Sequence, residues 1–491
     1  MNWANIAWVV YLLQWVLFIV ALFIVPPNRK PGEATAWLML IFLIPFLGFL
    51  LYLLLGSPKL SKQRRAMQGT MSETLTKATA TLKQNPEMAS VAALLDPPIP
   101  ERYQPIVCLN HQLGSMNAFG GNSVELLPDY QGAVDRIIQD IDNAQKYVHV
   151  EYFMFADDTT GGPMIDALIR AQERGVKCRV LIDDLGDTQF KKPVVTRLRA
   201  GNVETHLMLP VIIVGKDWTR LDLRNHRKIV VVDGQIGFTG SQNIIDRNYH
   251  KGANIKKGLY YIELVARVTG PIVGQLDAAF RTDWYSETKV VLSRETAPEV
   301  AFTPVKTGDV LCQVLPSGPG FDTENNLKLF VALFHAARQT ITIANPYFVP
   351  DESLMVAITS AAQRGVEVTL IVSEVGDQFL VYHAQRSFYE ELLRAGVKIH
   401  RYKSPVLLHS KHLSIDDDIA VIGSSNMDMR SFQLDLEVTL ICYDKGVVSD
   451  MQAIFADYLR HSAPLRLNEW ETRPSRAKFF DNLARLTSSL Q

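Results

Sequence analysis

Six residues recur twice in this chain at identical spacing. Each set reads His-x-Lys, then four residues, then Asp, and later Gly-Ser-x-Asn. The two sets are His226, Lys228, Asp233, Gly240, Ser241 and Asn243, and His409, Lys411, Asp416, Gly423, Ser424 and Asn426. A single His-x-Lys would mean little, but two copies that match at six positions are not expected by chance. The repeated set is therefore the first candidate for a functional site.

The residue types in this set are suited to the transfer of a phosphoryl group. Side chains alternate between the two faces of an extended strand, so a His and a Lys two positions apart point the same way. Two imidazoles, two ammonium groups and amide donors form an anion site, and phosphoryl transfer needs one because charge spreads over the equatorial oxygens. One histidine can attack phosphorus while the other protonates the leaving oxygen. This division requires one histidine from each copy, on opposite sides of one phosphate.

The two motif aspartates are expected to have a different task. Asp233 and Asp416 each lie five positions after the motif lysine, so their parity places them on the opposite face. We therefore expect them to anchor the turn after each strand, with a direct chemical role as the alternative. The Gly-Ser-x-Asn segments open the next turn and offer small polar groups that can reach back.

Other histidines are expected to be packed residues. They are His149, His206, His335, His383 and His400. His412 lies close to His409 in the chain, but its parity directs it to the other face of the sheet. No set of carboxylates and cysteines completes a metal shell there. The sequence therefore predicts no metal and no cofactor.

The elements around the motifs also occur twice. In each half an apolar helical stripe leads into a strand, a helix, a buried-looking strand, a second helix and then the His-x-Lys strand. The first helix after the strand ends at Arg174–Val176 in one half and at Arg364–Val366 in the other. Helices that alternate with short strands predict an α/β fold, here two duplicated α/β sandwich domains with mixed sheets. We expect these domains at residues 106–300 and 301–491.

Composition narrows the possible partners. A chain of 491 residues is long enough for two cores, and its net charge of −1 provides no basic field for nucleic acid. The four cysteines, Cys108, Cys178, Cys312 and Cys442, form no CxxC pattern. Cys178 and Cys442 lie in apolar strand-like runs, which predicts buried, reduced thiols.

Two uncharged stretches near the N-terminus, residues 6–25 and 36–55, each suit a bilayer core of ~30 Å if they are helical. The first lacks the basic start and the cleavage site of a signal peptide. We therefore expect a transmembrane helical hairpin at residues 1–56 and a polar linker at residues 57–105. Pro45, inside the second stretch, is tolerable in a membrane helix.

Charge near these stretches predicts an orientation. The loop between them carries Arg29 and Lys30, and the segment after the second carries Lys59, Lys62, Arg64 and Arg65. The positive-inside bias then places the N-terminus and the body of the protein in the cytoplasm.

Three further segments mix apolar and basic residues. Residues 209–224 and 404–408 precede the two motif histidines and either dip into a membrane interface or form ordinary core. The tail at residues 476–486 is either an amphipathic membrane contact or a helix packed on its own domain.

The paired motif resembles the HxKx4D motif of the phospholipase D superfamily, which is present there in two copies. Within that superfamily the chain is similar to the bacterial cardiolipin synthases. The resemblance covers nearly the whole chain and includes the N-terminal hairpin and three shorter stretches, Ser317–Gly320, Pro346–Pro350 and Asn426–Phe432.

The resemblance implies a reaction. Two phosphatidylglycerols become cardiolipin and glycerol at the bacterial inner membrane, without metal or nucleotide. His226 would be the nucleophile of a phosphatidyl-histidine intermediate, and His409 would protonate the leaving glycerol and then deprotonate the incoming hydroxyl. The resemblance counts Lys228, Asp233, Lys411 and Asp416 with the two histidines as catalytic residues. The lysines would hold the phosphate oxygens together with Asn243 and Asn426, and Ser241 and Ser424 would support them.

The resemblance also implies a carboxylate behind each histidine, a few tens of residues further along the same half. The matching positions are Glu263 and Glu437. A carboxylate on Nδ1–H fixes the tautomer and stabilises the imidazolium. An ordinary carboxylate at a strand end is the alternative for each.

Other functions stay open at this point. Water could replace the lipid alcohol as acceptor, which would make the protein a phospholipase D hydrolase, and the donor could be phosphatidylethanolamine. Cleavage of nucleic acid is disfavoured by the neutral net charge and the membrane segments. A membrane-tethered lipid-binding relic would be expected to have lost motif residues, and none is lost.

Overall fold

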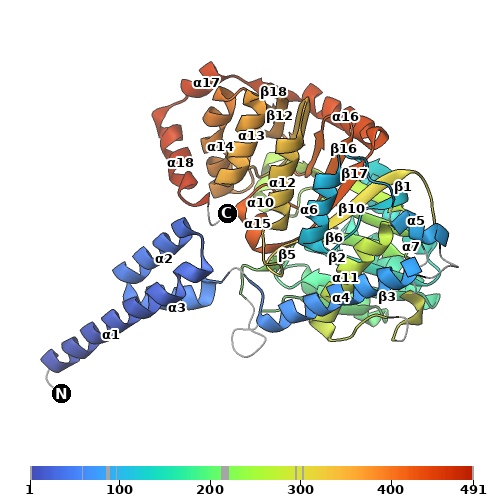
Figure 1. Ribbon diagram of the computed structural model, residues 1–491, viewed down its shortest axis with the longest axis horizontal. Helices are drawn as coiled ribbons and strands as arrows, with labels where there is room; N and C mark the ends of the chain where they lie inside the picture. Colours follow the sequence, from blue (N-terminus) through green and yellow to red (C-terminus); the bar gives the residue numbers. More distant parts are fainter. Residues whose placement is uncertain are drawn as a thin grey trace.

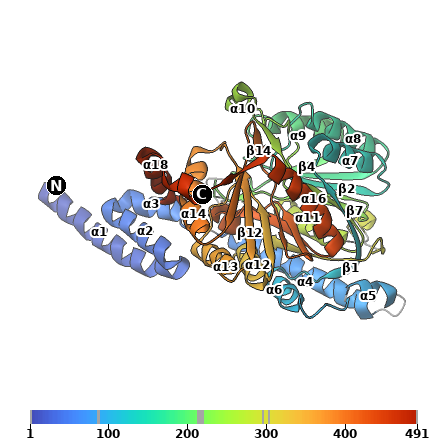
Figure 2. The same ribbon diagram turned by 90° about the horizontal axis from the view of Figure 1, so that it is seen from above.

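A computed structural model describes residues 3–57, 59–84, 89–95, 97–211, 220–293, 296–300 and 304–488. The N-terminal helices α1–α3 project from a mixed α/β body that contains both copies of the motif (Figures 1 and 2). Between them, the segment expected as a linker holds two helices, α4 (Lys62–Gln84) and α5 (Ala89–Leu95). Helix α4 packs along α11 of the body, and α6 (Gln104–Gly114) packs on the second half.

The two halves repeat the same order of elements. The first half contains β1 (Phe119–Leu127), α7 (Tyr130–Asp142), β2 (Tyr147–Tyr152), α8 (Gly161–Glu173), β3 (Lys177–Asp183), α9 (Lys191–Ala200), β4 (Glu204–Met208), β5 (Arg224–Asn225), β6 (Lys228–Val232), β7 (Ile236–Gly240), α10 (Gly252–Lys257), β8 (Tyr260–Ile262), β9 (Val265–Thr269) and α11 (Val273–Thr288). The second half contains β10 (Val310–Ser317), α12 (Asn325–Ala336), β11 (Thr340–Ala344), α13 (Glu352–Gln363), β12 (Glu367–Ser373), α14 (Phe379–Arg394), β13 (Lys398–Tyr402), β14 (Val406–Leu408), β15 (His412–Ile415), β16 (Ile419–Gly423), α15 (Met429–Gln433), β17 (Asp435–Tyr443), α16 (Lys445–Arg460), β18 (Ser462–Leu465), α17 (Leu467–Glu471) and α18 (Ser475–Arg485). The duplicated pattern expected from the sequence is present.

The strands of both halves join in one continuous sheet. Its order is β18-β13-β12-β11-β15-β16-β17-β10-β1-β9-β7-β6-β2-β3-β4, with β5 paired to β17. The antiparallel pair of β1 and β10 lies at the centre, and the strands on either side of it follow in matching order, except that β18 has no counterpart. The two halves are therefore related by a pseudo-two-fold axis.

Helices cover both faces of this sheet. The apolar faces of α7, α8 and α9 form one buried cluster, and those of α12, α13 and α14 form the matching cluster in the second half. Helices α11 and α16 bury a third cluster that draws side chains from both halves, such as Phe280 and Phe455. Because this core is shared, burial of apolar surface holds the two halves together as one body.

The N-terminal segment departs from the expected hairpin. Helix α1 (Trp3–Ile24) contains an apolar window, Ala7–Ile24, that is long enough to cross a bilayer. The second predicted span is wrong as one continuous helix, because it consists of α2 (Pro31–Leu43) and α3 (Pro45–Leu55), which break at Ile44. Pro45 has no N–H and disfavours helical backbone in the residue before it, so a new helix starts there. At 1.5 Å per residue α2 and α3 are about 20 Å and 16 Å long, short of a ~30 Å core.

The short connection after α1 (η1, Pro26–Asn28, and the residues after it) contacts the α/β body. Lys30 Nζ lies 2.8 Å from a carboxylate oxygen of Glu324, and Gln433 Nε2 donates to Glu33 at 3.3 Å. At the end of α3, Arg220 donates to the carbonyl of Ser57. Both ends of the α2–α3 pair are therefore on the side of the body.

Candidate active site

Two short ribbons that cross between the halves position the motif histidines. In one, β5 runs parallel to the start of β17, and the N–H of His226 donates to Leu436 O at 2.8 Å. In the other, β14 runs parallel to β8, and the N–H of His409 donates to Ile262 O at 2.9 Å. Each histidine follows a strand of its own half and is held by a strand of the other half.

The histidine rings have partners that cross in the same way. Nδ1 of His226 lies 2.9 Å from Glu437 Oε1, and Nδ1 of His409 lies 2.6 Å from Glu263 Oε1. The expectation that each carboxylate stands behind the histidine of its own half is wrong. Glu437 lies in β17, and Glu263 directly follows β8. Each of these strands pairs with a short strand of the other half, β5 and β14 respectively, so each carboxylate reaches the other copy's histidine.

Hydroxyl groups hold the two buried carboxylates in place. Glu437 accepts hydrogen bonds from the hydroxyls of Ser424 and Ser431, the latter at 2.8 Å. Glu263 accepts one from Tyr249 at 2.7 Å. Ser241, the counterpart of Ser424, bonds the backbone of residue 264, and its hydroxyl also helps to lower the pKa of Glu263. The support of the two carboxylates therefore differs between the halves.

The motif lysines fold back on their own histidines. Nζ of Lys228 donates to His226 O at 2.7 Å, and Nζ of Lys411 donates to His409 O at the same distance. Both lysines are almost fully buried. Burial lowers the pKa of Lys228 to about 7 and that of Lys411 to about 8. An anion between them would favour the charged form of both, so the site is suited to a phosphate.

The motif asparagines are linked to the two glutamates through hydroxyl groups, Asn243 through Tyr249 and the backbone N–H of Asn426 through Ser431. Asn243 donates to Tyr249 Oη at 3.3 Å and accepts from the N–H of Met154 at 3.3 Å. The side-chain oxygen of Asn426 makes no hydrogen bond within the part of the chain that the structure describes. Asn426 therefore keeps hydrogen-bonding capacity for a ligand.

The electrostatics of the two histidines differ. Burial, followed by the ammonium groups of Lys228 and Lys411, holds the pKa of His226 well below its usual range, and His409 adds to this effect. The two imidazoles are therefore close enough to interact. Burial also lowers the pKa of His409, but the carboxylate of Glu263 opposes that shift.

The pKa values of Glu437 and Glu263 also differ. Burial raises the pKa of Glu437 to about 7. Burial would also raise the pKa of Glu263, but the nearby groups His409 and Lys411 outweigh it and the pKa is lowered. Glu263 is thus an ionised partner that stabilises a protonated His409, and Glu437 is a weaker one for His226.

The motif aspartates lie away from this cluster, at the far ends of β6 and β15. Asp233 accepts from the backbone N–H groups of residues 145, 146 and 147, just before β2. Asp416 accepts from those of residues 338, 339 and 340, just before β11, and pairs with Arg102. Five residues of strand place each about 16 Å from the motif lysine. The structure places them at turn anchors, as their parity indicates.

His412 and His149 are core residues. His412 stacks on Phe455 at a centroid distance of 4.7 Å, and burial lowers its pKa to about 3. His149 stacks on Phe280 and its Nδ1 lies 2.7 Å from Asp277. Neither joins the cluster of motif histidines.

The sequence left membrane contact and core packing open for three segments, and the structure gives a different result for each. Residues 406–408 are the buried strand β14, so the core interpretation is confirmed there. Half of the segment 209–224, residues 212–219, lies outside the described residues, and Leu209 and Leu223 near its ends are buried. Helix α18 buries Asp481 and Ala484 and exposes Phe479 and Leu483.

Sequence reasoning missed several residues around His409. Rings of Tyr249, Tyr261 and Tyr347 stand nearly edge-on to it, with centroids 5.3–5.9 Å away. Asp377 binds two of these tyrosines. They come from four separate segments, and only the position of Tyr347 within Pro346–Pro350 gave any signal in the sequence.

Comparison with known families agrees with this arrangement. The family model described as "Cardiolipin synthase, PLD-like domain" matches residues 137–284 and 330–459, one region in each half. The chain belongs to this family. A second model, "Phospholipase_D-nuclease N-terminal", matches residues 12–57, the segment of α1–α3.

Relatives in the family match over almost their full length. The chain is 32% identical to "Cardiolipin synthase A" of Proteus mirabilis over 489 residues, which is 99% of this chain and 98% of the relative. It is also 32% identical to the protein of that name from Yersinia pseudotuberculosis, over 96% of this chain and 95% of the relative. These similarities extend through the N-terminal helices.

A solved structure shares the fold of the body. The crystal structure of phosphatidylserine synthase from Haemophilus influenzae superposes with a TM-score of 0.59 over 80% of this chain and 100% of that chain. Its sequence identity is 16%, so the likeness concerns the fold alone.

Proposed function

We propose that this protein is a cardiolipin synthase that transfers a phosphatidyl group from one phosphatidylglycerol to the hydroxyl of a second and releases glycerol. The observation that carries this proposal is the pair of motif histidines, one from each half, each held by a carboxylate of the other half. The family membership and the full-length similarity to cardiolipin synthases supply the substrate class.

His226 is the nucleophile in this proposal. Its Nδ1 faces Glu437, so donation of Nδ1–H leaves the Nε2 lone pair for attack on phosphorus. Its strongly lowered pKa keeps the ring neutral, as a nucleophile must be. The Nε2–P bond forms as the bond from phosphorus to the glycerol oxygen breaks.

His409 is the acid and then the base. Burial lowers the pKa of His409 in the free site, but an anionic phosphate beside the ring and ionised Glu263 behind it both favour the imidazolium, which gives its Nε2 proton to the leaving glycerol oxygen. Neutral His409 then takes the proton of the incoming hydroxyl, whose oxygen attacks phosphorus and releases His226. Lys228 and Lys411, with Asn243 and Asn426, neutralise and bind the phosphate oxygens.

The membrane segment supports a topology that differs from a two-span hairpin. Helix α1 crosses the bilayer once, while α2 and α3 enter and leave on the same side as a re-entrant pair. Exposed apolar residues surround their break, including Phe42, Leu43 and Phe46, so the break lies in the lipid core. Gly48 allows the close approach, because a Cβ there would lie 2.8 Å from Leu40 O.

Charge then orients the body. The connections on its side of the membrane carry the basic residues Arg29, Lys30, Lys59, Lys62, Arg64 and Arg65. The positive-inside bias places this side, and the catalytic halves, in the cytoplasm. The inner membrane of a bacterium is the location that follows from the proposed substrates.

The test of the function is direct. Purified protein in bilayers of phosphatidylglycerol should release glycerol and form cardiolipin in equal amounts. Formation of phosphatidic acid alone would refute the proposal and identify water as the acceptor. A matched preparation of His226→Ala serves as the blank.

A further inference from the structure

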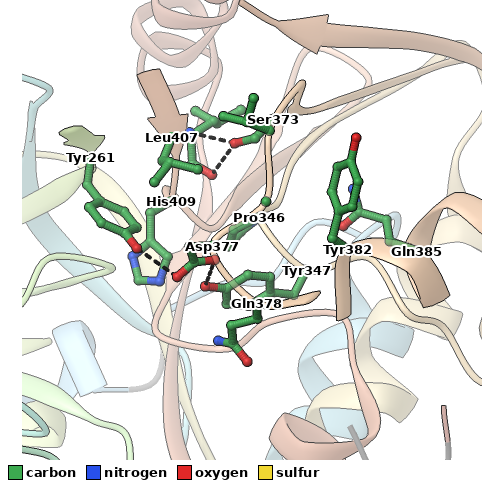
Figure 3. Close-up of a pocket in the computed structure, with 13 residues that line it drawn as sticks. Tyr261, Pro346, Tyr347, Ser373, Asp377, Gln378, Tyr382, Gln385, Leu407 and His409 are labelled. Atoms are coloured by element: carbon green, nitrogen blue, oxygen red, sulfur yellow. Dashed lines mark hydrogen bonds between the residues drawn. The ribbon is translucent and has the colours of Figure 1, made fainter. Parts of the chain in front are cut away.

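A pocket opens directly beside His409. It lies between β14 and the loops that follow β11 and β12. Figure 3 shows the carboxylate of Asp377 between the hydroxyls of Tyr261 and Tyr347, next to the ring of His409. Whatever alcohol His409 protonates or deprotonates must lie in or beside this pocket.

Asp377 organises the polar side of the pocket. It accepts hydrogen bonds from Tyr261 Oη at 2.7 Å and Tyr347 Oη at 2.9 Å, and Lys251 Nζ lies 2.5 Å from it. Its side chain is only 3% exposed. Three donors occupy three of about four lone-pair positions of a carboxylate, so roughly one acceptor position remains.

Asp377 and the phenol of Tyr347 present acceptors to a ligand. Each phenol has one O–H, and in Tyr261 and Tyr347 that hydrogen is directed to Asp377. Tyr261 Oη already accepts from Lys251 Nζ at 3.1 Å and from Asn254 Nδ2 at 3.5 Å, so of these two phenols Tyr347 is the one whose oxygen can accept from a group that enters the pocket. A ligand rich in donors fits this arrangement, which leaves alcohols and ammonium groups as the candidates.

Lys251 favours an alcohol over an ammonium group as the ligand. Its ammonium pairs with the single charge of Asp377, so the pair is neutral overall. Burial would raise the pKa of Asp377, but Lys251 outweighs it, so the carboxylate stays ionised and the pair persists. A second ammonium group, as in an ethanolamine headgroup, would be repelled by Lys251 at close range and find no free charge. A neutral polyol meets neither obstacle.

The first half lacks this arrangement. Its matching segment, residues 181–187, ends in Asp187 where residues 371–377 end in Asp377. Asp187 accepts from the backbone N–H groups of Gln189 and Phe190 at 3.0 and 3.1 Å and binds no tyrosine among the described residues.

The position of Tyr347 is also different in the first half. Phe155 and Phe348 make equivalent bridges to Ile244 and Met427, so the residue before each occupies an equivalent place. That residue is Tyr347 in the second half and methionine at position 154 in the first. Among the described residues, this combination of an aspartate with two tyrosines is therefore found on the side of His409 and not at the matching positions of the first half.

We propose that Asp377 and Tyr347 form a subsite for the free hydroxyls of a glycerol headgroup, with Tyr261 and Lys251 holding the carboxylate of Asp377 in place. The subsite binds the leaving glycerol of the donor lipid while His409 protonates its oxygen, and then the glycerol of the acceptor lipid. This inference rests on the proposed function and adds the residues that choose the alcohol. Asp377 is a specificity-determining residue in it, and His409 keeps the proton transfer.

Two matched lipids test the subsite. Phosphatidyl-1-propanol has the headgroup of phosphatidylglycerol without its two free hydroxyls. In single-turnover reactions with each lipid in phosphatidylcholine vesicles, the wild type should release glycerol at least about tenfold faster than propanol, because the analogue leaves buried polar groups unpaired. In Asp377→Asn this ratio should fall to within about threefold of unity, since the acceptor pattern is broken. Asp187→Asn, the control, should keep the wild-type ratio.

The outcomes separate the subsite from the function. Wild-type protein that forms no cardiolipin would refute the proposed function, whatever the ratio. Cardiolipin formation with an unchanged ratio in Asp377→Asn would overturn the subsite alone, because Asp377 would then only support the fold or His409. If Asp377→Asn does not fold, Tyr347→Phe decides: a reduced glycerol-to-propanol ratio supports the subsite, and an unchanged ratio overturns it.

Discussion

The carboxylate of Glu437 lies 2.9 Å from Nδ1 of His226, although the two residues belong to different halves of the chain. The same exchange pairs Glu263 with His409 at 2.6 Å. Neither half can therefore complete its own catalytic dyad. The active site is therefore built from residues of both halves, which also share one sheet and one core.

The nucleophile can be identified by trapping. We expect His226→Ala to reduce cardiolipin formation by at least about 10³-fold and to abolish any covalent phosphatidyl-enzyme, because no other group replaces the attacking nitrogen. Phosphatidylglycerol with labelled acyl chains, quenched on the millisecond scale and analysed by mass spectrometry, checks this. Label on His409 in the wild type would reverse the assigned roles.

Substitutions of Glu263 and Glu437 are expected to affect different steps in the formation and release of the intermediate. Glu263→Gln weakens the acid and base His409, so it should reduce both formation and release of the intermediate, by roughly 10²-fold or more. Glu437→Gln acts on His226 and should mainly slow formation. Rapid-quench measurement of the two steps distinguishes them. The reverse pattern would indicate that each glutamate serves the histidine of its own half in solution.

Glu437 also predicts a dependence of stability on pH. Its folded pKa of about 7 lies above the ordinary value of 4.5, so the stability linked to its proton is fully present below about pH 4.5 and is lost as pH rises through 7. The loss is on the order of 3 kcal/mol at 1.36 kcal/mol per pKa unit. Glutamine carries no proton to lose, so Glu437→Gln should gain thermal stability relative to wild type between pH 5 and pH 8. Calorimetry in detergent measures this, and a difference that is the same at both pH values would contradict it.

The motif aspartates should matter for folding more than for chemistry. Asp416→Ala removes the acceptor of three backbone N–H groups and should lower the free energy of unfolding by roughly 2–4 kcal/mol. The rate per folded molecule should stay within about tenfold of wild type. Neighbouring Asp417→Ala is the control, because that side chain is exposed and pairs with Lys445. Complete loss of turnover in a fully folded Asp416→Ala protein would show that Asp416 takes part in the reaction.

The topology can be tested by labelling. In a background of Cys108→Ser, a cysteine at Lys30 should react with an impermeant maleimide only from the cytoplasmic side, because residue 30 contacts the catalytic body. A cysteine at Trp3 should react only from the opposite side. A two-span hairpin would give the reverse result at both positions.

The sequence by itself determined the chemistry and the repeat. The spacing of His226 and Lys228 places both on one side of an extended segment, and the offset of Asp233 removes it from that side, because strand geometry is local. The alternation of helices and strands and the apolar length of α1 are likewise local properties.

Only the tertiary structure decided which groups meet. The exchange of Glu263 and Glu437 depends on strands that cross between halves, and the pocket at Asp377 gathers residues from Lys251 to Tyr347. Lys30, in the connection after α1, pairs with Glu324, which lies far along the chain. This contact places the connection on the side of the body, whereas the expected two-span hairpin would place it on the opposite side of the membrane. Sequence spacing reports neighbours along a strand or helix, whereas these contacts are set by how distant segments pack around a shared core.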